Sequence, residues 1–258
     1  MHTISVINLK GGTGKTITTL SMAAELHSRG YRVLLVDADP QHNSSSFFRC
    51  DNPHWTLADV VTQEGVGPED VIVHSAFKGL DLVPSDMGLV YLDVRSAVDD
   101  KYVSYEFRRF LSIISGRYDI CLIDCPPSFT AASIAALLAA DEAIIPLKID
   151  AFGLSGLKEI RTQIESVARI NGKLTETVLL TIWRKTPAQV QGEELLRSSR
   201  IRLWKTHIRY SPKVDECTFT KEFLKMHSPT CAASVDYAAF VDEWEARNPG
   251  VKGGVQHG

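Results

Sequence analysis

The stretch Lys10-Gly11-Gly12-Thr13-Gly14-Lys15-Thr16 follows an apolar segment, residues 3–9, and precedes a helical pattern over residues 15–29. Glycine-rich loops that bind phosphate occur in this strand, loop and helix context. Glycines let backbone N–H groups turn inward around phosphate oxygens, and the following helix adds the positive end of its dipole. The stretch therefore predicts a phosphate-binding loop. A plain turn is the alternative, but a turn does not require lysine and threonine after the last glycine.

The side chains of this loop have predicted roles that depend on a bound nucleotide. Lys15 is expected to neutralise the β- and γ-phosphates, and the Thr16 hydroxyl is expected to coordinate Mg²⁺. Lys10 stands at the first position of the loop, where the common form has glycine. From there it cannot easily fold back onto phosphates held by Lys15, but it could reach a nucleotide in a second, facing subunit. We therefore expect a dimer that depends on nucleotide.

Three aspartates follow apolar runs that are typical of strands buried on both faces. Residues 33–36 and 120–123 show no polar alternation, as expected in a parallel sheet. Asp37, Asp39 and Asp124 lie at or just after the ends of these runs, and ligands bind at the carboxyl edge of such sheets. We expect Asp124 to hold Mg²⁺ through a water molecule. The alternative for each aspartate is that it only caps the next helix or turn.

These segments together resemble a known family. The sequence Lys-Gly-Gly-Thr-Gly-Lys-Thr looks like the deviant Walker A loop of the ParA/MinD family of P-loop ATPases. Residues 33–41 resemble the second strand and switch I of ParA/Soj partition proteins, and residues 118–128 resemble their Walker B strand and switch II. The order and separation of the motifs also fit, so the resemblance covers most of the chain.

The resemblance implies that the chain binds ATP and Mg²⁺ and hydrolyses ATP. It implies catalytic roles for Lys10, Lys15 and Asp39, with Asp39 positioning or activating the attacking water. It places Thr16, Asp39 and Asp124 at the metal. Arg209 stands in the place of a proline that is usual in the base-side segment of the family. The nucleotide contacts that it implies are Lys10, Gly11, Gly12, Thr13, Gly14, Lys15, Thr16, Ile17 and Pro126.

Apolar runs alternate with helical patterns, which predicts an α/β fold with a doubly wound, mostly parallel sheet flanked by helices, the P-loop NTPase fold. Residues 51–79 are punctuated by proline and glycine, which predicts short helical pieces. We expect one ATPase domain over residues 1–247 and a flexible tail over residues 248–258, whose sequence cannot hold a helix. Strands are predicted over residues 3–9, 33–37, 80–84, 119–124, 143–147, 178–183 and 203–208. Helices are predicted over residues 15–29, 103–115, 130–140, 154–171, 190–199, 215–226 and 232–246.

The composition favours a cytoplasmic protein. The sequence has no run of 18 apolar residues and no basic leader followed by an apolar segment. Five cysteines make an odd count and show no paired metal spacing, as expected for reduced thiols. Cys121 and Cys125 are four residues apart, but one ligand pair is too few for a tetrahedral site, so packing is the favoured interpretation.

A basic segment on an otherwise acidic chain points to a partner. Residues 184–213 carry a net charge of +6, whereas the whole chain carries −3. Such a patch is typical of proteins that bind a nucleic acid backbone, although basic runs are often only solvated faces. ParA/Soj proteins bind nonspecific DNA through basic residues of this half as an ATP-bound dimer. The resemblance therefore implies nonspecific DNA, a ParB-like stimulating protein and a nucleoid-associated location. The predicted DNA contacts are Arg197, Arg200, Arg202 and Lys205.

Other functional classes make different predictions. MinD-like proteins end in an amphipathic membrane-binding helix, which the glycine-rich tail does not resemble, so we expect no membrane partner. The loop begins at residue 10, so we expect no preceding helix-turn-helix domain of the kind in larger plasmid ParA proteins. A metabolic enzyme of the dethiobiotin synthetase-like type, acting on a small acid, is the alternative and would turn over without DNA. A bacterial tyrosine kinase domain would be expected to have a tyrosine-rich tail.

Overall fold

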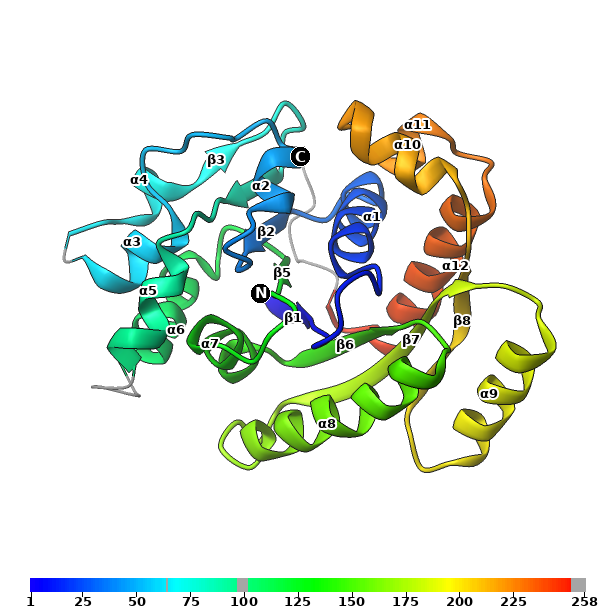
Figure 1. Cartoon of the computed structure of the whole chain (residues 1–258). Coiled ribbons are helices and arrows are strands. Elements are labelled where there is room, and N and C mark those ends of the chain that lie inside the picture. Colours follow the sequence, from blue (N-terminus) through cyan, green and yellow to red (C-terminus); the bar gives the residue numbers. More distant parts are fainter. Residues whose placement is uncertain (64, 97–101, 252–258) are drawn as a thin grey trace.

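A computed structural model describes residues 1–63, 65–96 and 102–251. Within them an eight-stranded sheet forms the centre of the molecule, in the order β3-β4-β2-β5-β1-β6-β7-β8 (Figure 1). Neighbouring strands are parallel except β3, which is antiparallel to β4. The strands are β1 (His2–Val6), β2 (Val33–Asp37), β3 (Val73–His74), β4 (Leu80–Val83), β5 (Ile120–Asp124), β6 (Glu142–Leu147), β7 (Thr175–Trp183) and β8 (Leu203–Arg209).

Helices cover both faces of the sheet (Figure 1). Helices α3 to α9 contribute to one apolar core, and α1, α2 and α10 to α12 contribute to the other. None of the helices in the described ranges is long and apolar enough to cross a membrane. The helices are α1 (Lys15–Ser28), α2 (Asn43–Phe47), α3 (Leu57–Thr62), α4 (Pro68–Val71), α5 (Leu89–Ser96), α6 (Tyr102–Ile114), α7 (Ala131–Ala139), α8 (Ala151–Ala168), α9 (Pro187–Ser198), α10 (Lys213–Thr220), α11 (Leu224–His227) and α12 (Ala232–Arg247).

Strand β5 is apolar up to its last residue because successive side chains enter the two cores in turn. On β5, Cys121 and Ile123 belong to the core under α7, whereas Ile120 and Leu122 belong to the core under α1. All four side chains are completely buried. A parallel sheet that is covered on both faces requires this pattern, which the sequence shows as an unbroken apolar run.

The strand register fixes the edge at which the sequence motifs meet. Asp37 at the end of β2 lies opposite Asp124 at the end of β5, and Val6 at the end of β1 is also opposite Asp124. The glycine-rich loop begins at Lys10, shortly after β1 ends at Val6. The loop therefore begins beside two acidic strand ends, as the topology of a parallel sheet predicts.

The predicted mostly parallel sheet and its flanking helices are confirmed, and the structure adds shorter elements. The stretch with many turn residues contains α3, α4 and the two-residue strand β3, and α2 and α5 were not predicted. The single helix predicted over residues 215–226 is wrong, because Lys221 adopts a left-handed conformation with φ 54° that separates α10 from α11. The predicted boundary of the tail stays a prediction, and residues 252–258 lie outside the described part of the chain.

Truncation of the central strand should be costly. Ile123→Ala truncates a completely buried side chain in the core between the sheet and its helices. We expect the free energy of unfolding, measured in urea, to fall by about 3 kcal/mol. Ile113→Ala is the matched control, because Ile113 is 55% exposed on α6. It should change the free energy of unfolding by less than about 1 kcal/mol. Equal losses for the two variants would contradict this assignment of the core.

Candidate active site

The glycine-rich loop has a backbone that only glycine adopts readily. Gly12 has φ 69° and Gly14 has φ 88°, both in the left-handed region, so a side chain at either position would be strained. Helix α1 begins at Lys15, immediately after Gly14, and Ile17 packs against the core beneath it. This junction of a glycine loop with a helix N-terminus is suited to binding an anion.

Side chains outside the loop hold it against the neighbouring strands. Asn8 accepts from the Lys10 amide at 3.0 Å through Oδ1 and donates to the Pro146 carbonyl at 2.7 Å through Nδ2. Thr181 of β7 donates its hydroxyl to the Thr13 carbonyl at 2.7 Å. Thr13 in turn donates to the Lys10 carbonyl at 3.3 Å. The loop is thus attached to β6 and β7 through contacts within the chain itself.

Lys15 is buried at the base of the loop. Its ammonium donates to the Lys10 carbonyl at 3.2 Å. Burial lowers the pKa of Lys15, and the nearby carboxylates of Asp124 and Asp39 act against that effect. The structure therefore brings Lys15 of the loop, Asp39 and Asp124 into one electrostatic site.

Lys10 is held within its own chain by Asp150. The Lys10 Nζ atom lies 2.7 Å from Asp150 Oδ1, an oxygen that also accepts from the Gly153 amide at 2.7 Å and so caps α8. Lys148 Nζ lies 3.4 Å from the other oxygen. The hydrogen bond from Lys10 is the main reason that the pKa of Asp150 is lowered. Asp150 is therefore ionised at neutral pH and neutralises the lysine at the loop entrance.

Asp37 and Asp39 both form local contacts at the end of β2. Asp37 Oδ2 accepts from the Ser45 amide at 2.8 Å and the Ser45 hydroxyl at 2.7 Å, so it anchors α2. Burial raises the pKa of Asp37 to about 6. Asp39 Oδ1 accepts from the Gln41 amide at 2.9 Å, which caps the turn after it. Both aspartates thus cap a neighbouring helix or turn, which is the alternative considered from the sequence. Asp39 also lies near Lys15.

Asp124 and Thr16 provide donors that suit a magnesium site. Burial, followed by the charge of Asp37, raises the pKa of Asp124 to about 7, while Thr16 lies close enough to lower it. Asp124 Oδ2 accepts from the Ser44 hydroxyl at 2.8 Å. Among the described residues its buried Oδ1 has no hydrogen-bond partner. A carboxylate oxygen without a partner beside a hydroxyl fits a Mg²⁺ ion, which takes few protein ligands and keeps several waters.

These residues lie at the carboxyl edge of the sheet and combine the parts that phosphoryl transfer needs. A loop and helix N-terminus can hold phosphates, Lys15 can neutralise them, and Thr16 with Asp124 can hold a metal. Pro126, two residues after Asp124, is also buried at this edge. The geometry is therefore that of a nucleoside triphosphate site.

Comparisons with known proteins agree with this geometry. A family model described as an AAA domain matches residues 1–176. The chromosome partitioning protein ParA of Caulobacter vibrioides is 30% identical over 251 residues, which cover 94% of this chain and 93% of that protein. This chain belongs to the ParA family.

Some of the solved structures similar to this ParA-family chain contain a nucleotide. The Cyanothece McdA(D38A)–ATP complex has a TM-score of 0.82 at 26% identity and covers 99% of each chain. Cobyrinic acid a,c-diamide synthase of Mycobacterium smegmatis, solved with an ATP analogue and magnesium, has a TM-score of 0.84 at 23% identity. That match covers 97% of this chain and 96% of the synthase, and its low identity shows the fold alone.

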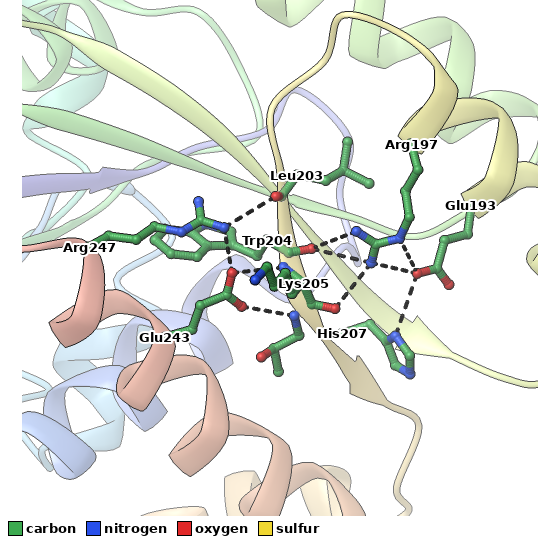
Figure 2. A network of polar contacts seen from close by, with 9 residues as sticks. Glu193, Arg197, Leu203, Trp204, Lys205, His207, Glu243 and Arg247 are labelled. Carbon is green, nitrogen blue, oxygen red and sulfur yellow. Dashed lines mark hydrogen bonds and ion pairs between the residues drawn. The ribbon is translucent and has the colours of Figure 1, made fainter.

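The basic segment of this ParA-family member includes β8, the edge strand of the sheet next to β7. Strand β8 lies between α9 and α12 (Figure 2). Arg197 of α9 donates to Glu193 at 2.6 Å and to the Trp204 and Lys205 carbonyls of β8 at 3.3 and 3.1 Å. From the other side, Glu243 of α12 accepts from the amides of Lys205 and Thr206, both at 2.9 Å. The guanidinium of Arg197 thus holds α9 against β8.

The other three predicted DNA contacts are differently placed. Arg200, Arg202 and Lys205 have exposed side chains. Across the ranges that the structure describes, these side chains form no ion pair, in contrast to Arg197, which pairs with Glu193. Basic side chains that form no internal ion pair, here called uncommitted, can approach a phosphate backbone without first breaking such a contact.

Arg209, which replaces the usual proline of the family, is a structural contact. Its guanidinium and its amide bind Asp236 of α12, with distances of 2.8 and 2.9 Å to the carboxylate.

The adjoining end of β7 is irregular, because its register against β8 shifts between Leu180 and Trp183. Ile182 within this shift has φ 52°, an unfavourable conformation for a β-branched residue. Trp183 then stacks on His207 of β8 at 4.0 Å.

Several residues of the site were not predicted. Ser44 and Ser45 lie shortly after the segment that resembles switch I, which ends at residue 41. Asp150 follows the apolar run at residues 143–147, so the rule applied to Asp37 also marks Asp150. Asn8 and Thr181 lie inside predicted strands, where nothing in the sequence distinguishes them. No cluster of three metal-ligating side chains is present in the described portions of the chain, and the five cysteines are free.

The raised pKa of Asp37 predicts a pH-dependent stability. Because the folded protein binds this proton more tightly than the unfolded chain does, Asp37 makes the free energy of unfolding fall as pH rises from about 4 to about 6. Asp37→Asn should reduce that fall by about 2 kcal/mol. The free energy of unfolding in urea, measured at pH 4 and pH 7 in EDTA, tests this prediction, with the exposed Asp215→Asn variant as the control. The prediction would be contradicted if the free energy of unfolding of Asp37→Asn decreased with rising pH as much as that of the native chain.

Proposed function

We propose that the chain is an ATP-dependent DNA partition ATPase whose ATP-bound dimer binds DNA nonspecifically and releases it after hydrolysis. The observation that carries the proposal is Lys10, a lysine at the entrance of a complete phosphate loop whose second lysine, Lys15, lies near Asp39 and Asp124. Membership of the ParA family supports it, because the Caulobacter relative is named a chromosome partitioning protein. The proposed location is the cytoplasm, in association with the nucleoid.

ATP and Mg²⁺ are the proposed cofactors. The loop from Lys10 to Thr16, with Ile17 and Pro126, would contact the nucleotide, and Lys15 would neutralise its β- and γ-phosphates. Thr16 and Asp124, with Asp39 nearby, would hold the metal, which when bound supplies positive charge at the transferred phosphate. The ATP complex of McdA, similar over 99% of this chain, supports the choice of nucleotide.

Dimerisation would require Lys10 to change partners. In the single chain its ammonium is neutralised by Asp150 at 2.7 Å. A phosphate held by a facing subunit would offer a more highly charged partner, and the lysine is only half-buried, so it can leave without unpacking the core. Asp150 would keep its bond to the Gly153 amide, and α8 would retain its cap.

Hydrolysis would use the acidic residues at the ends of β2 and β5. Asp39 would orient the attacking water, while Lys15 and Lys10 stabilise the negative charge that develops on the phosphate oxygens. Capping by Asp39 of its own turn fixes the carboxylate at the site before substrate binds. A ParB-like protein would then stimulate turnover and release the DNA.

The proposed DNA surface consists of Arg200, Arg202 and Lys205, with Arg197 supporting it from α9. These residues lie in the segment with net charge +6, and the first three have uncommitted side chains. Binding through phosphates alone would be insensitive to sequence and strongly weakened by salt. The alternative, a metabolic enzyme, is supported only by the similarity of the fold to that of a synthase. It predicts ATP turnover that DNA does not affect.

Nucleotide should control DNA binding through Lys10. The native chain should bind a nonspecific duplex with ATP and Mg²⁺, but at least about tenfold more weakly with ADP or without nucleotide. Lys10→Ala should still bind ATP yet sediment as a monomer and lose DNA binding. Lys148→Ala, which removes the neighbouring lysine that also contacts Asp150, is the control. Normal ATP-dependent dimers of Lys10→Ala would overturn the cross-subunit role.

Removal of uncommitted arginines should reduce the dependence of DNA affinity on salt. The double variant Arg200→Ala/Arg202→Ala should lower the slope of log affinity against log salt by about 2, because each phosphate contact contributes about one. Arg108→Ala/Arg169→Ala, which removes two exposed arginines from α6 and the end of α8, should leave the slope unchanged. The opposite ranking would place the DNA surface elsewhere.

A further inference from the structure

Two consecutive serines of α2 bind two different buried carboxylates. Ser44 donates its hydroxyl to Asp124 Oδ2 at 2.8 Å. Ser45 donates its hydroxyl to Asp37 Oδ2 at 2.7 Å and its amide to the same oxygen at 2.8 Å. Neither serine has any exposed surface, and the two aspartates are at most 1% exposed. The family motifs quoted from the sequence give these serines no role.

The register of the sheet explains how one short helix reaches both acids. Asp37 and Asp124 lie opposite each other at the ends of β2 and β5. Successive residues of a helix point about 100° apart, so neighbouring serines on α2 can reach neighbouring strands. Helix α2 therefore bridges the two strand ends from above the carboxyl edge.

The bridge extends to a third strand through Ser85. The Ser85 amide donates to the Ser45 hydroxyl at 3.0 Å, and the Ser85 hydroxyl donates to the Asp39 carbonyl at 2.7 Å. Asp39 also donates its amide to Asp37 Oδ1 at 3.2 Å. The ends of β4 and β2 and the segment that carries Asp39 are thus linked through buried hydrogen bonds, and Ser44 joins that unit to Asp124.

Ser44 and Ser45 differ in whether the aspartate that each one binds has an oxygen without a hydrogen bond. Both oxygens of Asp37 accept hydrogen bonds within the chain. At Asp124 only Oδ2 does so, and across the described residues Oδ1 is buried without a partner. An unpaired buried acceptor is costly unless a ligand satisfies it. The hydroxyl of Ser44 therefore determines which oxygen of Asp124 is presented to that ligand.

We propose that Ser44 is a positioning residue of the metal and nucleotide site: it fixes Asp124 so that Oδ1 faces the ion, and it ties α2 and Asp39 to that orientation. The inference rests on the proposed function, because it presupposes Mg²⁺ with ATP. Residues that orient a metal ligand typically affect metal affinity by 10- to 100-fold when they are removed. A serine that only caps or packs α2 would not act on the metal selectively.

The test measures binding of a fluorescent ATP analogue to the full chain during titration with Mg²⁺, and again in EDTA. Ser44→Ala should raise the Mg²⁺ concentration at half-saturation about tenfold or more, with little change in the affinity measured in EDTA. Ser44→Thr, which keeps the hydroxyl, should restore the native value to within about threefold. Ser46→Ala is the matched control, because Ser46 lies on the same helix but donates to Asp51.

Two results would overturn the inference: a Mg²⁺ midpoint in Ser44→Ala equal to that of Ser46→Ala, or an equal loss of affinity with Mg²⁺ and in EDTA. If Ser44→Ala does not fold, as judged by thermal unfolding, Ser44→Cys retains the size with a weaker donor and should show the same shift. Failure of the native chain to bind the analogue at all would instead contradict the proposed function.

Discussion

Two carboxyl groups buried side by side, those of Asp37 and Asp124, impose the main constraint on this molecule. The parallel pairing of β2 and β5 places them opposite each other, and burial raises the pKa of both. The charge of Asp39 adds to the rise at Asp37, and the charge of Asp37 adds to the rise at Asp124. Two buried like charges can persist only if donors or cations surround them. Much of the architecture at the carboxyl edge meets that requirement.

The surrounding elements divide this task. Helix α2 supplies hydroxyl and amide donors, α1 supplies Lys15, and the turn after β2 supplies the Asp39 amide. Each donor comes from a segment that also belongs to the proposed nucleotide site. The same contacts that make the buried acids tolerable therefore hold the loop, the acidic strand ends and α2 in one arrangement, ready to receive a charged ligand.

Much of this arrangement could be predicted from local sequence because its signals are local. The glycine loop, the apolar runs and the aspartates that end them determine the mostly parallel sheet and the edge at which the site lies. The contacts between distant segments could not be predicted. The pairing of Lys10 with Asp150 joins residues 140 positions apart, and the commitment of Arg197 to β8 depends on how α9 packs. Nor does charge counting distinguish Arg197 from Arg200, since only the fold decides which arginine has an internal partner. The break between α10 and α11 was missed because lysine gives no sequence signal for the left-handed conformation of Lys221.

The irregular end of β7 has a mechanical consequence. Ile182 holds an unfavourable backbone conformation between Thr181, which binds the phosphate loop, and Trp183, which stacks on His207 of β8. Strain of this kind lasts only while contacts on both sides maintain it. The unfavourable conformation of Ile182 therefore depends on two contacts at once, one with the phosphate loop and one with the basic edge strand, so the geometry of these two parts is coupled at the end of β7.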